Sequence, residues 1–231
     1  MLQIQQVNPL SLFVGQNQID ARSSWFAGGM SQSGKSTAIL FVQQLYIQLN
    51  RVITIDTINE YRNEKAISDL DSLKLFIKQN RFNKFGRLVW RWQRGMTDKQ
   101  IKTTFNYICE YVMALGNVHF SVEEAHYYCD PHNMPTAYSR IYTEGRHYNV
   151  SKSASSQRMA KVHADVISLS ERKFQFQLDE ENDINKACSI FRGCADNILR
   201  LKRREALHKH NGIITSIQTD ELWKKLNQSL N

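Results

Sequence analysis

The segment Gly29-Met-Ser-Gln-Ser-Gly34-Lys35-Ser36 constrains the fold of this 231-residue chain more than any other. It follows an apolar run over residues 23–27 and opens a helical pattern over residues 35–49. The pattern G-x-x-x-x-G-K-S between a strand and a helix is typical of a P-loop, whose backbone N–H groups and helix N-terminus surround phosphate oxygens. We therefore expect nucleotide phosphates to contact Gly29, Ser31, Gln32, Ser33, Gly34, Lys35, Ser36 and Thr37.

Two side chains of this loop have distinct expected roles. Lys35 reaches the β- and γ-phosphates of ATP, and the Ser36 hydroxyl ligates Mg²⁺. The motif therefore predicts ATP and Mg²⁺ as cofactors. An incidental Gly/Ser-rich turn would explain the glycines, but not their place between a strand and a helix.

A second acidic site follows an apolar strand in the segment VHFSVEEAH. Glu123 is expected to hold Mg²⁺ through water, and Glu124 to polarise the attacking water as general base. Adjacent carboxylates at a strand end are otherwise ordinary solvated residues. Asp is the more usual residue at the first position, which leaves open which of the two carboxylates contacts the metal shell.

The residue Gln157 follows another predicted strand, over residues 150–155. An amide side chain can hydrogen-bond both a water and a phosphate oxygen, so Gln157 is a candidate γ-phosphate sensor. The alternative is a surface residue without a role in chemistry.

Short apolar runs alternate with longer amphipathic ones along the chain, as in βαβ units. Strands are expected at 23–27, 52–56, 87–92, 118–122, 150–155 and 173–178. Helices are expected at 35–49, 70–78, 98–115, 136–147 and 184–192, with another from Asp220. Asp98 is the expected cap of the third helix. This pattern predicts an α/β fold, with a mostly parallel central sheet flanked by helices on both faces.

The domain prediction is one nucleotide-binding domain over residues 1–198, with a short N-terminal extension at 1–22. Residues 199–231 form a basic C-terminal extension that is expected to pack on the same domain. No apolar stretch reaches 18 residues, so we expect no transmembrane segment.

The chain carries 30 Lys and Arg against 22 Asp and Glu, a net charge of +8. Such an excess favours polyanionic partners, nucleic acid before acidic membrane. The hydrophobic fraction of 42% excludes wholesale disorder. Four cysteines without CxxC spacing suit a reducing compartment. His126, Cys129 and His132 are spaced for zinc, but Pro131 interrupts any helix that would align them and a fourth ligand is not evident.

Four segments in order, GGMSQSGKST, IDTINEY, SVEEAH and EGRHYNVSKSASSQR, resemble the HerA/FtsK superfamily of DNA-pumping ATPases. Within it, the chain is most similar to genome-packaging ATPases of tailless, membrane-containing icosahedral viruses. The likeness covers residues 24–178. In that family an acidic strand end precedes a Glu-Tyr pair, matched here by Asp56 and by Glu60-Tyr61, with Asn59 where a glycine often stands.

This resemblance implies a RecA-like (ASCE) P-loop NTPase core, assembled as a ring, with a hexamer expected, around double-stranded DNA. It makes Arg146 the candidate trans-acting arginine and Gln157 the sensor glutamine. The implied function is ATP-driven packaging of a viral genome into a preformed capsid. The implied partners are capsid-vertex or viral membrane proteins, and the implied locations are the virion packaging vertex and the host cytoplasm.

Two basic segments are candidate DNA contacts. The first, over residues 81–94, interleaves cations with aromatics and offers Arg91 and Arg94. Its alternative is a sheet strand whose Leu88, Trp90 and Trp92 pack inward. The second, over residues 199–210, offers Lys202, Arg203 and Arg204, and its alternative is a solvated helix face.

Other functions compatible with the motifs are a plasmid-transfer or chromosome-pumping ATPase, a small-molecule or nucleotide kinase, and a nucleotide-bound capsid-assembly factor without turnover. A kinase needs an acceptor pocket and an arginine-rich lid. Glu124 and Gln157 argue against a factor that does not hydrolyse ATP, because such a factor gains nothing from fast hydrolysis.

Overall fold

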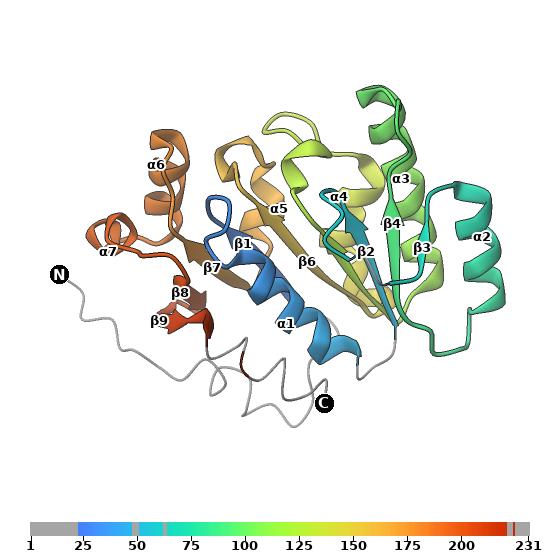
Figure 1. The fold of residues 1–231 in the computed structure, drawn as a ribbon, viewed down its shortest axis with the longest axis horizontal. Helices are drawn as coiled ribbons and strands as arrows, with labels where there is room; N and C mark the ends of the chain where they lie inside the picture. The colour runs from blue at the N-terminus through green and yellow to red at the C-terminus, as the bar shows by residue number, and fades with distance from the viewer. Residues whose placement is uncertain (1–22, 48–50, 62–63, 221–223, 225–231) are drawn as a thin grey trace.

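The computed structural model describes residues 23–47, 51–61, 64–220 and 224. Within these residues one sheet has the strand order β3-β4-β2-β5-β6-β1-β7-β8-β9 (Figure 1). The strands are β1 (Ser24–Gly28), β2 (Arg51–Asp56), β3 (Ala66–Ile67), β4 (Gly86–Arg91), β5 (Val118–Val122), β6 (Val150–Ser156), β7 (Arg172–Phe176), β8 (Glu205–His210) and β9 (Ile213–Gln218). Neighbouring strands from β3 to β7 pair in parallel, and β8 and β9 add an antiparallel hairpin.

The six strands expected from the sequence are confirmed as β1, β2, β4, β5, β6 and β7. Strand β3 was not expected, nor were β8 and β9. The basic segment over residues 199–210 is not a solvated helix face. It runs from the end of α7 through a turn into β8, whose Ala206, Leu207 and His208 are buried.

Helices cover both faces of the sheet, as predicted. They are α1 (Lys35–Ile47), α2 (Leu70–Gln79), α3 (Asp98–Leu115), α4 (Thr136–Thr143), α5 (Ala164–Ser168), α6 (Glu181–Ile190) and α7 (Ala195–Leu199). Three short 3₁₀ helices are η1 (Ala125–Tyr127), η2 (Gly145–Tyr148) and η3 (Met159–Lys161). The predicted terminal helix from Asp220 lies almost wholly outside the described residues.

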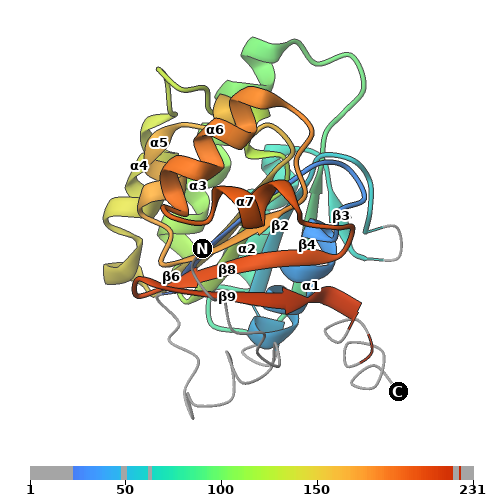
Figure 2. The same cartoon turned by 90° about the vertical axis from the view of Figure 1, so that its left-hand side faces the viewer.

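Strand alternation divides the core between the two faces. Trp25 and Ala27 of β1 pack with Ala38, Ile39 and Val42 of α1 in one cluster. The intervening Phe26 belongs to the larger cluster on the other face, which includes residues of all the remaining α-helices, α2 to α7. Of the described helices, α1 lies on one face and α2 to α7 on the other, and Figure 2 shows α3 to α7 gathered on that second side of the sheet.

Local sequence signals set the ends of the longest helix, α3. Its N-cap is Thr97 and not Asp98, because the Thr97 hydroxyl accepts from the Gln100 backbone N–H and the Gln100 side chain returns the contact in a capping box. Asp98 is the first helical residue, where its negative charge favours the helix N-terminus. Gly116 caps the other end at a φ of +58°.

The strand order determines where chemistry can take place. Strand β6 pairs with both β5 and β1, so the carboxyl ends of all three parallel strands lie side by side. The loops after these ends carry Glu123 and Glu124, Gln157, and the glycine-rich turn. In open α/β sheets, ligands bind outside the carboxyl ends of the strands. Among the described residues, no helix is both long enough and apolar enough to cross a bilayer.

Candidate active site

The glycine-rich turn connects β1 to α1, as expected. Close packing around it explains both glycines: a Cβ at Gly29 would lie 2.5 Å from Phe176 Cβ, and one at Gly34 would lie 2.9 Å from Thr219 Oγ1. Gly34 also has a φ of +115°, a conformation that disfavours any other residue. The turn is therefore enclosed by β7 and by the end of β9, where only hydrogen fits.

Lys35 lies at the start of α1 and is 95% buried. Its Nζ donates a hydrogen bond of 3.0 Å to the carbonyl oxygen of Met30, across the turn. Burial lowers the pKa of Lys35, and the negative charges of Glu124, Glu60 and Glu123 oppose this shift. The ammonium group of Lys35 therefore lies inside the loop, where the negative charge of a bound phosphate would stabilise it.

Ser36, the predicted Mg²⁺ ligand, contacts a carboxylate. Its hydroxyl donates a hydrogen bond of 3.2 Å to Glu60 Oε1. Asp56 shapes the intervening loop, since its carboxylate accepts from the backbone N–H groups of Glu60 at 2.9 Å and Tyr61 at 3.3 Å. Asn59, which stands where the resembled family often has glycine, adopts a φ of +58°. The left-handed conformation that favours glycine is therefore present, supplied by asparagine.

Glu123 is buried at the end of β5, beside this loop. Its Oε1 accepts a hydrogen bond of 2.6 Å from the Tyr61 hydroxyl, whereas Oε2 is buried with no hydrogen-bond partner among the described residues. Burial raises the pKa of Glu123 to about 8, and the charges of Glu60, Asp56 and Glu124 add to the rise, while the Tyr61 hydrogen bond opposes it. A buried carboxyl oxygen without a partner in the chain fits a position that contacts a cation or its bound water.

Glu124 and Gln157 lie together, as their expected roles require. Glu124 adopts a left-handed backbone conformation, with φ 50° and ψ 54°, and its side chain is buried. Its Oε2 accepts a hydrogen bond of 2.8 Å from the Gln157 backbone N–H and lies 3.3 Å from His126 Nδ1. The ends of β5 and β6 are therefore joined through this carboxylate.

Sequence reasoning missed three contributors to this region. Glu60 contacts Ser36, and His126 lies between Glu124 and Ser156, whose hydroxyl is 2.9 Å from His126 Nδ1. The third is the turn before β8. Arg203 donates from Nε to the Gln32 carbonyl oxygen over 3.1 Å, and the Arg204 backbone N–H donates to Ser33 O over 2.8 Å. No local pattern could have found this last contact, because about 170 residues separate its partners.

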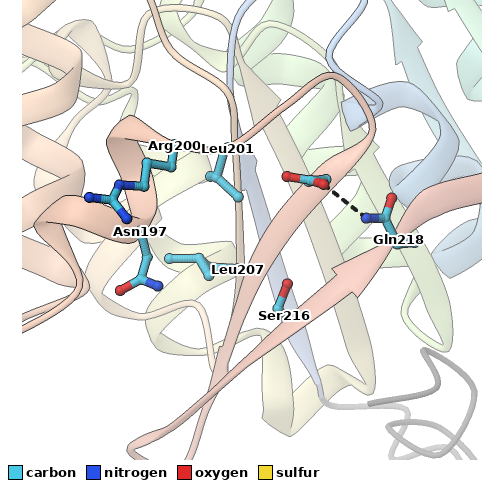
Figure 3. A pocket seen from close by; sticks show the side chains of 7 residues that line it. Asn197, Arg200, Leu201, Leu207, Ser216 and Gln218 are labelled. Atoms are coloured by element: carbon cyan, nitrogen blue, oxygen red, sulfur yellow. Dashed lines mark hydrogen bonds between the residues drawn. The ribbon is translucent and has the colours of Figure 1, made fainter. Parts of the chain in front are cut away.

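The turn before β8 is itself fixed by Glu205. Its two carboxylate oxygens accept hydrogen bonds from the Lys202 backbone N–H at 3.0 Å and from Gln218 Nε2 at 3.1 Å. Glu205 also lines a polar pocket of about 300 Å³ between α7 and the β8–β9 hairpin (Figure 3). None of the predicted phosphate-binding residues lines this pocket, so it is separate from the P-loop.

Part of what was predicted for the two candidate DNA-contact segments disagrees with the structure. Trp90 is 2% exposed and packs edge-on against Trp92, so these aromatics pack inward and the base-stacking interpretation of them is wrong. Arg91 lies 3.5 Å from Asp56 and also donates to the Tyr61 carbonyl oxygen, while Arg94 is exposed. Lys202 and Arg203 are also exposed, and Arg204 pairs with Asp220 at 2.7 Å. DNA contact by any of them stays a prediction.

Arg146 is exposed on η2, before the amino end of β6. Gln157 follows the opposite end of this seven-residue strand, so the two lie on the order of 20 Å apart. The alternatives to a trans role are an ion pair of Arg146 with Glu144 or a charge at a helix C-terminus. The ion pair is not seen, because Glu144 pairs with Arg140 at 2.9 Å, whereas Arg146 does lie in the last turn of η2.

The zinc hypothesis receives no support. Cys129 is buried and donates to the Ala125 carbonyl oxygen, His126 faces Glu124, and His132 is exposed. Across the described part of the chain, no group of three or more His, Cys, Asp and Glu side chains is arranged to hold a metal ion. Mg²⁺ in nucleotide sites does not need such a cage, because phosphates and water supply most of its ligands.

Solved structures of known proteins share this fold. The genome packaging NTPase B204 from Sulfolobus turreted icosahedral virus 2, in complex with ATP-gammaS, superimposes with a TM-score of 0.67 at 16% identity, over 86% of this chain and 97% of that one. This chain has a P-loop NTPase fold. VirB4 of Thermoanaerobacter pseudethanolicus gives a TM-score of 0.61 at 12% identity, over 88% of this chain and 91% of that one.

The pCW3 conjugation coupling protein TcpA, with ATPgS, gives a TM-score of 0.56 at 13% identity, over 96% of this chain and 69% of that one. No protein-family model and no curated protein sequence matches the chain. B204, VirB4 and TcpA are all remote from this chain in sequence.

Proposed function

We propose that this chain is an ATP-driven translocase of double-stranded DNA that packages a viral genome. The observation that carries the proposal is the convergence of Lys35, Ser36, Glu123, Glu124 and Gln157 at the adjoining ends of β1, β5 and β6. These residue types are the ones that ATP hydrolysis requires, and they come from three separate segments. The likeness to the packaging NTPase B204 supports the choice of DNA as substrate.

The geometry supports the following roles. Lys35 would bind the β- and γ-phosphates, and Ser36, whose hydroxyl now contacts Glu60, would hold Mg²⁺. Glu123 would hold Mg²⁺ through water, using its unpartnered Oε2. When bound, Mg²⁺ neutralises charge that develops on the phosphates.

Two further residues act on the water and the γ-phosphate. Glu124 orients and deprotonates the attacking water, while the Gln157 amide contacts the γ-phosphate. The Gln157 backbone N–H is hydrogen-bonded to Glu124. In this proposal, a shift of Gln157 on contact with the γ-phosphate therefore also shifts the general base, Glu124.

In this proposal the chain assembles as a ring, with a hexamer expected, and Arg146 acts on the nucleotide of a neighbouring subunit. Its position beyond the opposite end of β6 from Gln157 supports this, because it is far from the nucleotide site of its own subunit. The proposed partners are double-stranded DNA and a capsid-vertex or viral membrane protein. The proposed locations are the virion and the host cytoplasm.

A same-fold alternative is a plasmid-transfer ATPase, which the likeness to the conjugation coupling protein TcpA favours. Both functions predict turnover that duplex or single-stranded DNA stimulates, and they differ in which form is preferred. A kinase predicts DNA-independent turnover with a small acceptor.

The test is ATPase activity with no DNA, with duplex DNA and with single-stranded DNA, using Lys35→Ala as the inactive control. Stimulation by duplex DNA, lost steeply as salt rises, supports the packaging motor, because phosphate contacts release counterions. Preference for single strands supports conjugation. Turnover unaffected by either DNA contradicts the proposal. Lys202→Ala alone is the suitable probe of the DNA contact, because Arg203 and Arg204 also contact the P-loop.

A further inference from the structure

The sheet beneath α1 contains a continuous line of buried polar side chains where an apolar face is expected. On β5 and β6, residues 120, 122, 150 and 154 belong to the large apolar cluster on the far face. Their alternating neighbours therefore face α1. The polar seam, as we define it, consists of Gln43, Tyr61, His119, Ser121, Ser151 and Ser153, each at most 5% exposed.

The seam ends at the candidate active site. Tyr61 donates its hydroxyl hydrogen to Glu123 Oε1 over a short distance of 2.6 Å. This contact occupies one carboxylate oxygen and leaves Oε2 without a partner among the described residues. Tyr61 therefore fixes one of the two carboxyl oxygens of Glu123.

Tyr61 is in turn held by Gln43, in the middle of α1. Gln43 Nε2 donates to the Tyr61 hydroxyl over 3.0 Å and to Ser121 Oγ over 2.8 Å. A hydroxyl has one hydrogen, so accepting from Gln43 leaves the Tyr61 hydrogen for Glu123. The guanidinium of Arg87 lies 5.1 Å above the Tyr61 ring, which fixes the ring from its face.

The rest of the seam anchors Ser121. Ser153 Oγ donates to Ser121 Oγ over 2.9 Å, and His119 bridges Ser153 at 2.9 Å and Ser151 at 3.0 Å. Burial lowers the pKa of His119 to about 3, so the imidazole is neutral. Each residue of this line makes at least one hydrogen bond, while the Oε1 of Gln43 has no partner among the described residues. The hydrogen bonds connect α1, the loop after β2, β5 and β6.

We propose that Tyr61, held by Gln43, is a positioning residue that orients Glu123 toward the Mg²⁺ shell and keeps this orientation in register with the P-loop helix α1. The inference rests on the proposed function, since it assumes that Glu123 contacts water bound to Mg²⁺. Helix α1 begins at Lys35, so the same rigid helix carries the phosphate-binding end and the tyrosine's anchor. Nucleotide binding and metal binding are thereby linked through Gln43 and Tyr61, neither of which contacts a ligand itself.

The main test is Tyr61→Phe, which removes the hydroxyl and keeps the ring over which Arg87 lies. The matched control is Tyr138→Phe, because Tyr138 is also a buried tyrosine. Within the described part of the chain, the hydrogen-bond partner of its hydroxyl is another hydroxyl, that of Tyr142, at 3.5 Å. A second variant, Gln43→Leu, removes the anchor and leaves Tyr61 intact. Thermal unfolding reports whether each variant is folded.

The readout is binding of a fluorescent, non-hydrolysed ATP analogue as Mg²⁺ is titrated, which needs no turnover. We expect Tyr61→Phe to raise the Mg²⁺ concentration for half-maximal binding roughly tenfold, with a smaller rise for Gln43→Leu and none for Tyr138→Phe. Analogue binding in the absence of Mg²⁺ should not change, because Lys35 and the loop are untouched.

A double-mutant cycle with Glu123→Gln separates positioning from simple stabilisation. If Tyr61 acts through Glu123, adding Tyr61→Phe to the Glu123→Gln chain raises the Mg²⁺ requirement no further. An equal rise in both backgrounds, or no rise in the folded Tyr61→Phe protein, overturns the inference. If analogue binding by the wild-type protein does not respond to Mg²⁺, or if the wild type does not bind the analogue, the proposed function itself is contradicted. This result is seen before any variant is compared.

Discussion

The backbone N–H of Gln157 donates a hydrogen bond of 2.8 Å to Glu124 Oε2. This bond joins the end of β6 to the end of β5 and holds Glu124, whose backbone is left-handed, in a single orientation. The carboxylate oxygen not used by this bond is the one that can take a proton from water. The contact therefore predicts different outcomes for two changes at the same residue.

Glu124→Gln should leave ATP binding intact and lower turnover about 10²–10⁴-fold, because an amide oxygen still accepts from Gln157 but cannot act as a base. Glu124→Ala should lower turnover similarly and also lower the thermal unfolding midpoint, because the Gln157 N–H loses its acceptor. Single-turnover hydrolysis and calorimetry measure the two effects. Wild-type turnover in Glu124→Gln would assign the base to another residue.

Arg203→Ala should weaken ATP affinity roughly threefold to tenfold, because Arg203 holds the Gln32 carbonyl oxygen and side chain at 3.1 and 3.2 Å. Lys202→Ala is the matched control: it removes the neighbouring exposed cation, whose backbone and not its side chain contacts Glu205. Equilibrium binding of a labelled nucleotide measures both. Equal losses in the two variants would indicate a general charge effect rather than support of the P-loop.

Arg146 should act in trans. Subunits with Arg146→Ala keep an intact P-loop, and subunits with Lys35→Ala keep an intact arginine, so mixed rings contain some competent interfaces. We expect the mixture to recover ATPase activity that neither variant shows alone, since an arginine finger is worth about 10³–10⁵ in rate. Ring assembly is checked by light scattering. Inactive mixed rings of normal size would place Arg146 outside the chemistry.

Acid should destabilise the fold through two buried histidines. Burial lowers the folded-state pKa of His119 and of His208 from 6.5 to about 3, so the unfolded chain binds more protons between these values. Stability is then retained above pH 6.5 and lost as the pH falls toward 3, at about 1.4 kcal/mol per pH unit for each histidine.

Urea unfolding at pH 7 and pH 5, compared between wild type and His208→Phe, isolates the contribution of one histidine, which we expect to be about 2 kcal/mol. The comparison is needed because the raised pKa of Glu123 changes stability in the opposite direction in both proteins. The substitution suits the site because His208 is buried, with its ring 4.9 Å from that of Phe174. The exposed His132→Gln serves as the control and should leave the loss unchanged. An identical pH dependence in wild type and His208→Phe would contradict the assignment.

The P-loop, the six principal strands and the carboxylates at a strand end were all predictable from the sequence. These features depend on residues close together in the chain: alternation of apolar residues, a glycine turn between strand and helix, and acidic residues directly after an apolar run. Even the left-handed Asn59 follows local rules, because asparagine tolerates positive φ better than most residues.

Only the tertiary structure decided which strands are neighbours and what the C-terminal segment does. Strand β6 lies between β5 and β1, and this order brings Gln157 to Glu124. The basic segment before β8 contacts the P-loop through Arg203, and Tyr61 donates a hydrogen bond to Glu123, 62 residues further along the chain. Pairing between distant strands depends on which buried surfaces and hydrogen-bonding groups satisfy one another in the folded chain, and no local pattern of residues encodes that choice.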